Sequence, residues 1–128
     1  MKGRFPSLAL AIALLATTAA TAFALPIEKY RGNVSAGSPA TVMFATQPTD
    51  NAVILTLQAR NGGDRDMKVY DVATDTLVAG ISIPREAKSW ATYVPLNPSR
   101  TYRVVISVAD GRTGFTLYVN HCQNGSCF

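Results

Sequence analysis

The stretch Val53-Ile-Leu-Thr-Leu-Gln-Ala-Arg60 decides the fold class. Every second residue from Val53 to Ala59 is apolar, whereas the residues between them are polar from Thr56 onward. A period of two is typical of a β-strand with one buried face, because successive side chains point to opposite sides of the backbone. An amphipathic helix would place its apolar residues three and four positions apart. The stretch therefore predicts a strand.

The same alternation recurs along the chain from Pro39 onward, and turn-forming residues separate the runs. Short alternating runs with turns at such spacing are typical of a two-sheet antiparallel fold. We therefore predict an all-β protein, a single antiparallel two-sheet β-sandwich of jelly-roll-like form with about seven to eight strands. Trp90 shares a face with Thr92 and Val94, which predicts a core position for it. The expected strands cover residues 41–45, 52–59, 67–70, 77–83, 89–96, 102–109 and 115–119, and residues 25–38 form either an edge strand or an ordered lead-in.

The N-terminus has the pattern of a cleaved signal peptide. Lys2 and Arg4 precede an apolar run over residues 8–16, and Ala22-Phe23-Ala24 supplies a small-residue cleavage site. The apolar run is shorter than the roughly 20 residues that a membrane span needs. We predict a signal peptide over residues 1–24 and an exported protein, either periplasmic or extracellular, whose mature form has no stable membrane insertion.

Removal of the signal peptide changes the charge. The loss of Lys2 and Arg4 leaves ten basic and eight acidic residues, a net charge of +2. No basic run is present, so nucleic acid is not an expected partner. The remaining length fits one small domain, for which we predict residues 25–121, followed by a C-terminal tail over residues 122–128.

The only two cysteines lie close together in this tail. Cys122 and Cys127 bracket the turn dipeptide Asn124-Gly125, which brings the two thiols together. Since exported proteins meet an oxidising environment, we predict an intramolecular disulfide. A metal site and an intermolecular bridge remain as alternatives, although zinc requires more ligands than the two cysteines and His121 supply.

The segment Asn61-Gly-Gly-Asp-Arg-Asp66 has two main interpretations, a structural turn and a calcium site, with a catalytic carboxylate pair as a third. As a structural turn, its glycines permit positive φ, and Asp64 and Asp66 bond nearby backbone amides. As a calcium site, Asn61, Asp64 and Asp66 offer oxygen ligands. Calcium usually takes six to eight oxygens, more than this loop supplies by itself. We favour the turn and keep calcium as the only candidate cofactor.

No recognisable catalytic motif is present. The sequence contains no nucleophile elbow, no zinc-protease helix motif and no phosphate-binding loop. His121 adjoins Cys122 at the end of the last predicted strand, where we expect a solvated or capping residue rather than a general base. We therefore assign no catalytic residues and predict a protein that is not an enzyme, with a small hydrolase of unrecognised site as the alternative.

A ligand-contact face is the alternative to catalysis. If Val69 and Leu117 point inward, their sequence neighbours point outward. Tyrosine suits ligand contact because it combines apolar area with a hydroxyl group. The candidate face consists of Tyr70, Tyr118, Arg103 and Lys68. The competing interpretation is that the two tyrosines merely cover a sheet surface or lie on different sheets.

The order of several motifs resembles the bacterial pre-peptidase C-terminal (PPC-like) domain. The central element is Gly63-Asp-Arg-Asp-Met-Lys-Val-Tyr-Asp71, which is similar to the family's glycine/aspartate turn running into an Asp-x-Asp-Leu-x-Val strand. The other matching segments are Tyr30 to Gly37, Val42-Met-Phe44, Ala52 to Ala59, Tyr102-Arg-Val-Val-Ile106 and Gly114-Phe-Thr-Leu-Tyr-Val119. The resemblance implies a β-sandwich that accompanies exported enzymes or binds extracellular material.

A second segment resembles, more weakly, the fibronectin type III and immunoglobulin-like modules. Leu96-Asn-Pro-Ser-Arg-Thr-Tyr-Arg-Val-Val-Ile106 is similar to their corner motif, in which a tyrosine hydroxyl bonds back to the backbone. Together the observations predict a secreted, non-catalytic module that binds an extracellular protein or polysaccharide or accompanies exported enzymes. The alternative is a secreted or periplasmic inhibitor or adaptor that docks on one protein partner.

Overall fold

The computed structural model describes residues 27–124 and 126–127, so the predicted signal peptide and its cleavage site lie outside the described residues. The strands are β1 (Glu28–Ser35), β2 (Ala40–Ala45), β3 (Ala52–Ala59), β4 (Arg65–Asp71), β5 (Thr76–Ile83), β6 (Ser89–Pro95), β7 (Thr101–Val108), β8 (Arg112–Gln123) and β9 (Ser126–Cys127). The described part is all-β, as predicted, and each strand expected from the alternation is present. Within these residues no helix has the length and hydropathy needed to cross a membrane.

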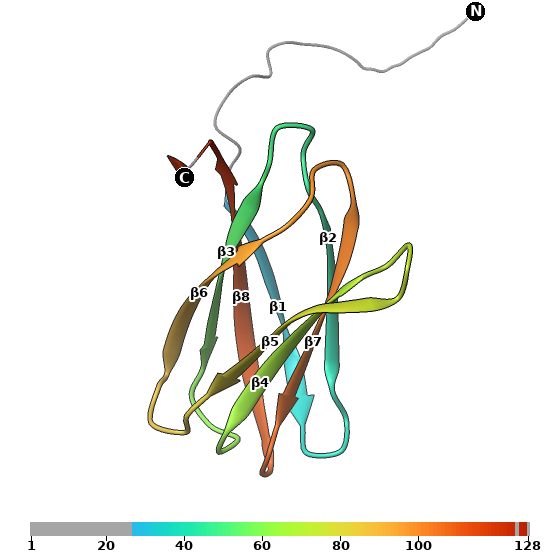
Figure 1. The fold of residues 1–128 in the computed structure, drawn as a ribbon. Helices are drawn as coiled ribbons and strands as arrows, with labels where there is room; N and C mark the ends of the chain where they lie inside the picture. Colours follow the sequence, from blue (N-terminus) through green and yellow to red (C-terminus); the bar gives the residue numbers. More distant parts are fainter. Residues whose placement is uncertain (1–26, 125, 128) are drawn as a thin grey trace, which may run out of the picture.

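The strands form two antiparallel sheets that pack face to face (Figure 1). The first sheet has the order β1-β8-β3-β6, with β9 pairing the end of β8, and the second sheet has the order β2-β7-β4-β5. From β1 to β4, successive strands alternate between the two sheets, which is the connectivity of a jelly roll. The predicted sandwich class is therefore confirmed.

The core lies between the two inner faces. It is made by the alternating apolar residues of both sheets, including Leu55 and Leu117 from the first and Met67 and Ile106 from the second, all with no more than 2 % exposure. Each of these residues has a polar or partly exposed neighbour on the outer face, so the alternation places every strand unambiguously. The burial of these side chains is the main stabilising contribution to the fold.

Trp90 does not lie in the core, where the sequence predicts it. It faces inward, because it is paired with the buried Leu57, but its side chain is 37 % exposed. The core position predicted for Trp90 is therefore wrong. The physical reason is that β6 is the edge strand of the first sheet, so no further strand covers its free side.

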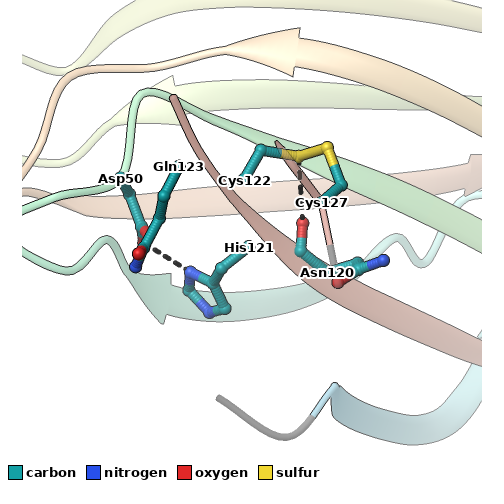
Figure 2. The surroundings of a disulfide bond; sticks show 6 residues. All are labelled: Asp50, Asn120, His121, Cys122, Gln123 and Cys127. Carbon is teal, nitrogen blue, oxygen red and sulfur yellow. Dashed lines mark hydrogen bonds and ion pairs between the residues drawn. A yellow bond between two sulfur atoms is a disulfide. The ribbon is translucent and has the colours of Figure 1, made fainter. Parts of the chain in front are cut away.

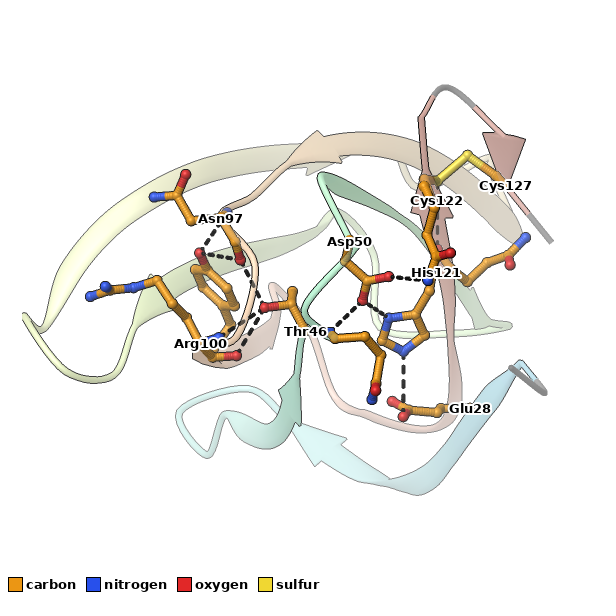
Figure 3. Close-up of polar contacts among 12 residues, drawn as sticks. Glu28, Thr46, Asp50, Asn97, Arg100, His121, Cys122 and Cys127 are labelled. Atoms are coloured by element: carbon orange, nitrogen blue, oxygen red, sulfur yellow. Dashed lines mark hydrogen bonds and ion pairs between the residues drawn. A yellow bond between two sulfur atoms is a disulfide. The ribbon is translucent and has the colours of Figure 1, made fainter. Parts of the chain in front are cut away.

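The two ends of the sandwich carry different loops. One end holds the β2–β3 and β6–β7 loops together with the start of β1 and the end of β8 (Figure 1). There, the Tyr102 hydroxyl accepts a hydrogen bond from the backbone N–H of Asn97 at 3.0 Å. Thr46 Oγ1 donates to the carbonyl of Asn97 at 2.7 Å and accepts from the backbone N–H of Arg100 at 3.0 Å (Figure 3). These contacts fasten the β2–β3 loop to the β6–β7 loop.

Candidate functional site

A cluster of polar side chains around the buried Asp50 and His121 lies at this end of the sandwich. His121 Nδ1 is hydrogen-bonded to Asp50 Oδ2 at 2.5 Å, and His121 Nε2 lies at an ion-pair distance of 3.4 Å from Glu28 Oε2 (Figure 3). Gln123 Nε2 donates to Asp50 Oδ1 at 3.1 Å. We call Glu28, Asp50, His121 and Gln123 the histidine cluster.

Three separate parts of the chain build the histidine cluster. Glu28 comes from the first residue of β1, Asp50 from the β2–β3 loop, and His121 and Gln123 from the end of β8. The backbone N–H of Gln47 donates to Asp50 Oδ2 at 2.7 Å, which closes a turn of the loop around the carboxylate. A carboxylate that accepts several hydrogen bonds can be buried at acceptable cost. The cluster therefore connects the start of β1 and the end of β8 to the β2–β3 loop.

A tyrosine extends the cluster along β1. Tyr30 Oη donates to Glu28 Oε1 at 3.0 Å. Burial of the phenol and the hydrogen bond and negative charge of Glu28 raise the pKa of Tyr30 to about 12. Tyr30 therefore stays protonated and keeps donating to Glu28 throughout the neutral range.

The histidine cluster has two elements of a hydrolytic triad but not the third. A carboxylate at Nδ1 orients an imidazole, as in serine hydrolases, but such a base needs a nucleophile at Nε2 and access for substrate. Among the described residues, Nε2 faces Glu28 and has no hydrogen-bonded hydroxyl. His121 is 4 % exposed and Asp50 is 1 % exposed, so the pair is closed to substrate. The sequence-based expectation that His121 is solvated or capping is wrong.

The disulfide lies beside the histidine cluster. Cys122 and Cys127 are bonded, with their Cα atoms 4.0 Å apart, and face each other across the β8–β9 pairing (Figure 2). The predicted disulfide is therefore present in the structure, and it agrees with an oxidising compartment. β8 continues to Gln123, so the predicted boundary between domain and tail falls inside a strand.

The segment Asn61 to Asp66 lies at the opposite end of the sandwich and forms a turn. Gly62 and Gly63 have φ angles of 102° and 71°, which favour glycine. Asp64 Oδ1 accepts from the backbone N–H of Arg85 at 3.1 Å, across to the β5–β6 loop. Backbone bonds from Ala109 to Asp64 and from Asp110 to Gly62 tie the same turn to the β7–β8 loop.

A buried arginine occupies the inner side of this turn. Arg65 is 4 % exposed, and its guanidinium donates to the carbonyls of Asn61 and Gly63 at 3.3 and 3.0 Å. It also donates to the carbonyls of Pro84 and Ala87 in the β5–β6 loop. The converging carbonyl oxygens of both loops are thus bound to a cation that the chain itself supplies.

The three candidate calcium ligands do not form one ligand set in the described structure, because Asp64 and Asp66 line one shallow pocket and Asn61 does not line it. Asp64 points toward Arg85, whereas Asp66 belongs to the outer face of β4 and pairs in register with Ser82 and Ser107. Within the described part of the chain, no group of three or more histidine, cysteine, aspartate or glutamate side chains is placed to hold a metal ion.

The predicted ligand-contact face is divided between the sheets. Lys68, Tyr70 and Arg103 lie together on the outer face of the second sheet, where Tyr70 is opposite Arg103. Tyr118 lies on the outer face of the first sheet, opposite Lys29 and Thr56. The four residues therefore point outward as predicted, but they cannot contact one ligand surface, because the whole sandwich separates Tyr118 from the other three.

The outer face of the second sheet carries a row of side chains across all four strands. In register from β2 to β5, the row is Met43, Arg103, Tyr70 and Leu77, which we call the aromatic row. The Arg103 guanidinium lies 4.8 Å from the centre of the Tyr70 ring, a cation–π distance, and its Nη2 lies 2.8 Å from Asp75 Oδ1. Met43 and Leu77 are 51 % and 50 % exposed, so apolar surface flanks a fixed aromatic–guanidinium pair.

Comparison with known protein families gave no match, and a search of curated proteins gave none either. The resemblances to the PPC-like and fibronectin type III families therefore stay predictions. The tyrosine-corner bond of Tyr102 exists as a structural feature, whichever family it belongs to.

Proposed function

We propose that this protein is an exported, non-catalytic binding module that docks on an extracellular protein through the aromatic row. The observation that carries the proposal is the row itself. It places an exposed methionine, a tyrosine–arginine pair and an exposed leucine in register across four strands. Tyrosine, arginine and methionine are enriched where proteins contact each other.

The pairing of Arg103 supports a preorganised contact. Its guanidinium is held by Asp75 on one side and by the Tyr70 ring on the other. A side chain that is already fixed loses less conformational freedom when a partner binds. Arg103 is thus already in contact with Tyr70 and Asp75 before a partner binds.

The state of the histidine cluster supports a role without catalysis. The only imidazole of the sequence is buried between two carboxylates. Export is supported by the predicted signal peptide and by the disulfide, which agrees with an oxidising compartment.

Photo-crosslinking from the aromatic row tests the proposal. A photo-reactive amino acid at Met43 should crosslink one protein in the producing cells, whereas the same amino acid at Ala91, on the outer face of the other sheet, should not. With the purified partner, Tyr70→Ala should weaken binding at least tenfold, which is about 1.4 kcal/mol. Thr56→Ala on the first sheet is the matched control. Equal crosslinking from both positions, or unchanged affinity of Tyr70→Ala, would exclude the aromatic row as the docking surface.

A further inference from the structure

The outer face of the first sheet differs in charge from the rest of the surface. Lys29, Arg31, Arg60 and Arg112 lie on or beside it, as the register of β1, β8 and β3 shows. The eight carboxylates lie elsewhere, in the loops, in the histidine cluster or on the second sheet. The outer positions of the first sheet, all of them described, therefore carry basic groups without any acidic one.

A shallow groove crosses this face near the β3–β4 turn. Its floor includes Thr116, Gln58 and Ser89, which follow Arg31 in register across all four strands. At a strand spacing of about 4.8 Å, the four positions span about 14 Å, which is enough for an oligosaccharide. Gly114 lies in the groove and leaves it without a side chain at that point.

Basic side chains surround the groove. Arg31, Arg60 and Lys88 line it, and within the described structure none of the three forms an ion pair. Arg85, Arg100 and Arg103, by contrast, are each paired with an aspartate. No ion pair among the described residues therefore neutralises the positive charges of the groove, and a concave surface of one sign concentrates ligands of the opposite charge.

We infer that this groove binds an acidic polysaccharide, a chain of sugars that carry carboxylate groups. The guanidinium groups of Arg31 and Arg60 can each take a carboxylate through two parallel hydrogen bonds. The hydroxyls of Thr116 and Ser89 and the amide of Gln58 supply donors and acceptors for sugar hydroxyls. The ligand class follows from this combination of a polar floor with a basic rim.

The lining of the groove disfavours a nucleic acid. Single-stranded nucleic acids are held by aromatic side chains that stack on the bases. The one aromatic residue in the lining is Phe115, which is 6 % exposed and belongs to the core. The groove thus has charge for a polyanion but no stacking surface for bases.

The groove lies on the first sheet and the aromatic row on the second, so an acidic polysaccharide would be a second ligand beside the protein partner of the proposed function. A module with an apolar docking surface on one side and an acidic-sugar groove on the other could hold a protein partner on a polysaccharide matrix. Each surface is tested with its own variants, so one can fail while the other stands.

Binding of hexagalacturonate to the oxidised protein, measured by calorimetry, tests the groove. Maltohexaose is the uncharged control, and a short single-stranded oligonucleotide is the control for any polyanion. We expect the hexagalacturonate to bind and the other two to bind at least tenfold more weakly. Arg31→Gln combined with Arg60→Gln should reduce hexagalacturonate affinity at least tenfold.

A neutral substitution separates groove binding from simple charge attraction. A Cβ added at Gly114 meets its nearest side-chain atom at 3.6 Å, an ordinary contact, so Gly114→Leu should fold while filling the groove. Gly80→Leu is the matched control, because Gly80 lies on the second sheet with nothing within 4 Å of an added Cβ. Gln58→Glu, which keeps the side-chain shape, places a negative charge on the floor and tests whether the anion binds over this position.

We expect Gly114→Leu and Gln58→Glu to lose at least tenfold in affinity and Gly80→Leu to bind like the wild type. Absence of hexagalacturonate binding would overturn the inference. So would unchanged affinity in Gly114→Leu and Gln58→Glu, or equally tight binding of the oligonucleotide, since both would reduce the groove to a general anion surface.

Discussion

His121 Nδ1 lies 2.5 Å from Asp50 Oδ2, and this contact joins the end of the last long strand to the loop before β3. Both side chains are almost completely buried. The two residues are 71 positions apart in the sequence, so their contact closes a large part of the jelly roll. Buried polar contacts of this kind are sensitive to substitution, because a polar group left without its partner is costly in a low-dielectric interior.

Asp50→Asn should strongly destabilise the protein. The substitution keeps the side-chain shape but removes the charge and one of the two oxygens that accept from Gln47, His121 and Gln123. Each buried donor that loses its acceptor costs roughly 1–3 kcal/mol, and more where the acceptor is charged. Urea unfolding of the oxidised protein should show a loss of at least about 3 kcal/mol.

Asp75→Asn is the matched control for this substitution. Asp75 has a positive φ of 52°, which asparagine also tolerates, and its side chain is exposed. We expect a change within about 0.5 kcal/mol there, as for other surface substitutions. If Asp50→Asn behaved like Asp75→Asn, the histidine cluster would have no structural role.

Loss of the disulfide should have a smaller effect than loss of Asp50. The ring from Cys122 to Cys127 is short, and loop entropy for so few residues corresponds to at most about 2 kcal/mol. We expect the free energy of unfolding of the Cys122→Ala, Cys127→Ala double variant to lie within about 2 kcal/mol of the wild-type value. We also expect the amide protons of β9 to exchange faster in this variant. Urea unfolding measures the stability, and hydrogen exchange with mass spectrometry measures the exchange of the β9 amides. A loss comparable with that of Asp50→Asn would mean that the hairpin holds the histidine cluster together.

The strands and their faces could be predicted from the sequence, because alternation is local. Lys68 and Tyr70 lie outward and Met67 and Val69 inward, as their spacing predicts. The assignment of strands to sheets could not be predicted in the same way. Tyr118 follows the same alternation as Tyr70, yet it lies on the other sheet, since strand order depends on pairings between distant segments.

The histidine cluster was missed although the sequence contained a signal for it. Leu117, Val119 and His121 have the same parity along β8, so continuing the alternation by one step places the imidazole inward. Asp50 gave no such signal. It lies in a turn-rich segment where aspartate is common for local reasons, and only the folded chain brings it to His121.

The ion pair between Asp71 and Arg100 should make stability depend on pH in the acid range. Arg100 Nε donates to Asp71 Oδ2 at 2.7 Å, and this hydrogen bond, together with the positive charge, lowers the pKa of Asp71 below its ordinary value. The folded state therefore binds the proton at Asp71 less readily than the unfolded state does. The contribution of this ion pair to the free energy of unfolding is fully present above the ordinary carboxyl pKa and is lost as pH falls through the lowered pKa.

Asp71→Asn should consequently be less stable than the wild type at pH 7, with a difference that shrinks as the pH falls below about 4. Urea unfolding at a series of pH values measures this difference. Glu86→Gln, which removes an exposed carboxylate from the β5–β6 loop, is the control and should show no comparable convergence. A constant gap between Asp71→Asn and the wild type across the acid range would contradict the linkage.

Calcium should not change the stability of the protein. Asp64 is engaged by Arg85, and the buried Arg65 guanidinium already binds the carbonyls of Asn61 and Gly63. A second cation there would meet this positive charge at short range. Thermal unfolding curves of the oxidised protein in millimolar calcium and in excess chelator should therefore coincide. A ligand at a hundredfold excess over its Kd would add about 2.7 kcal/mol, so a true site would be evident. A rise with calcium that Asp64→Asn combined with Asp66→Asn abolished would instead make this turn a metal site.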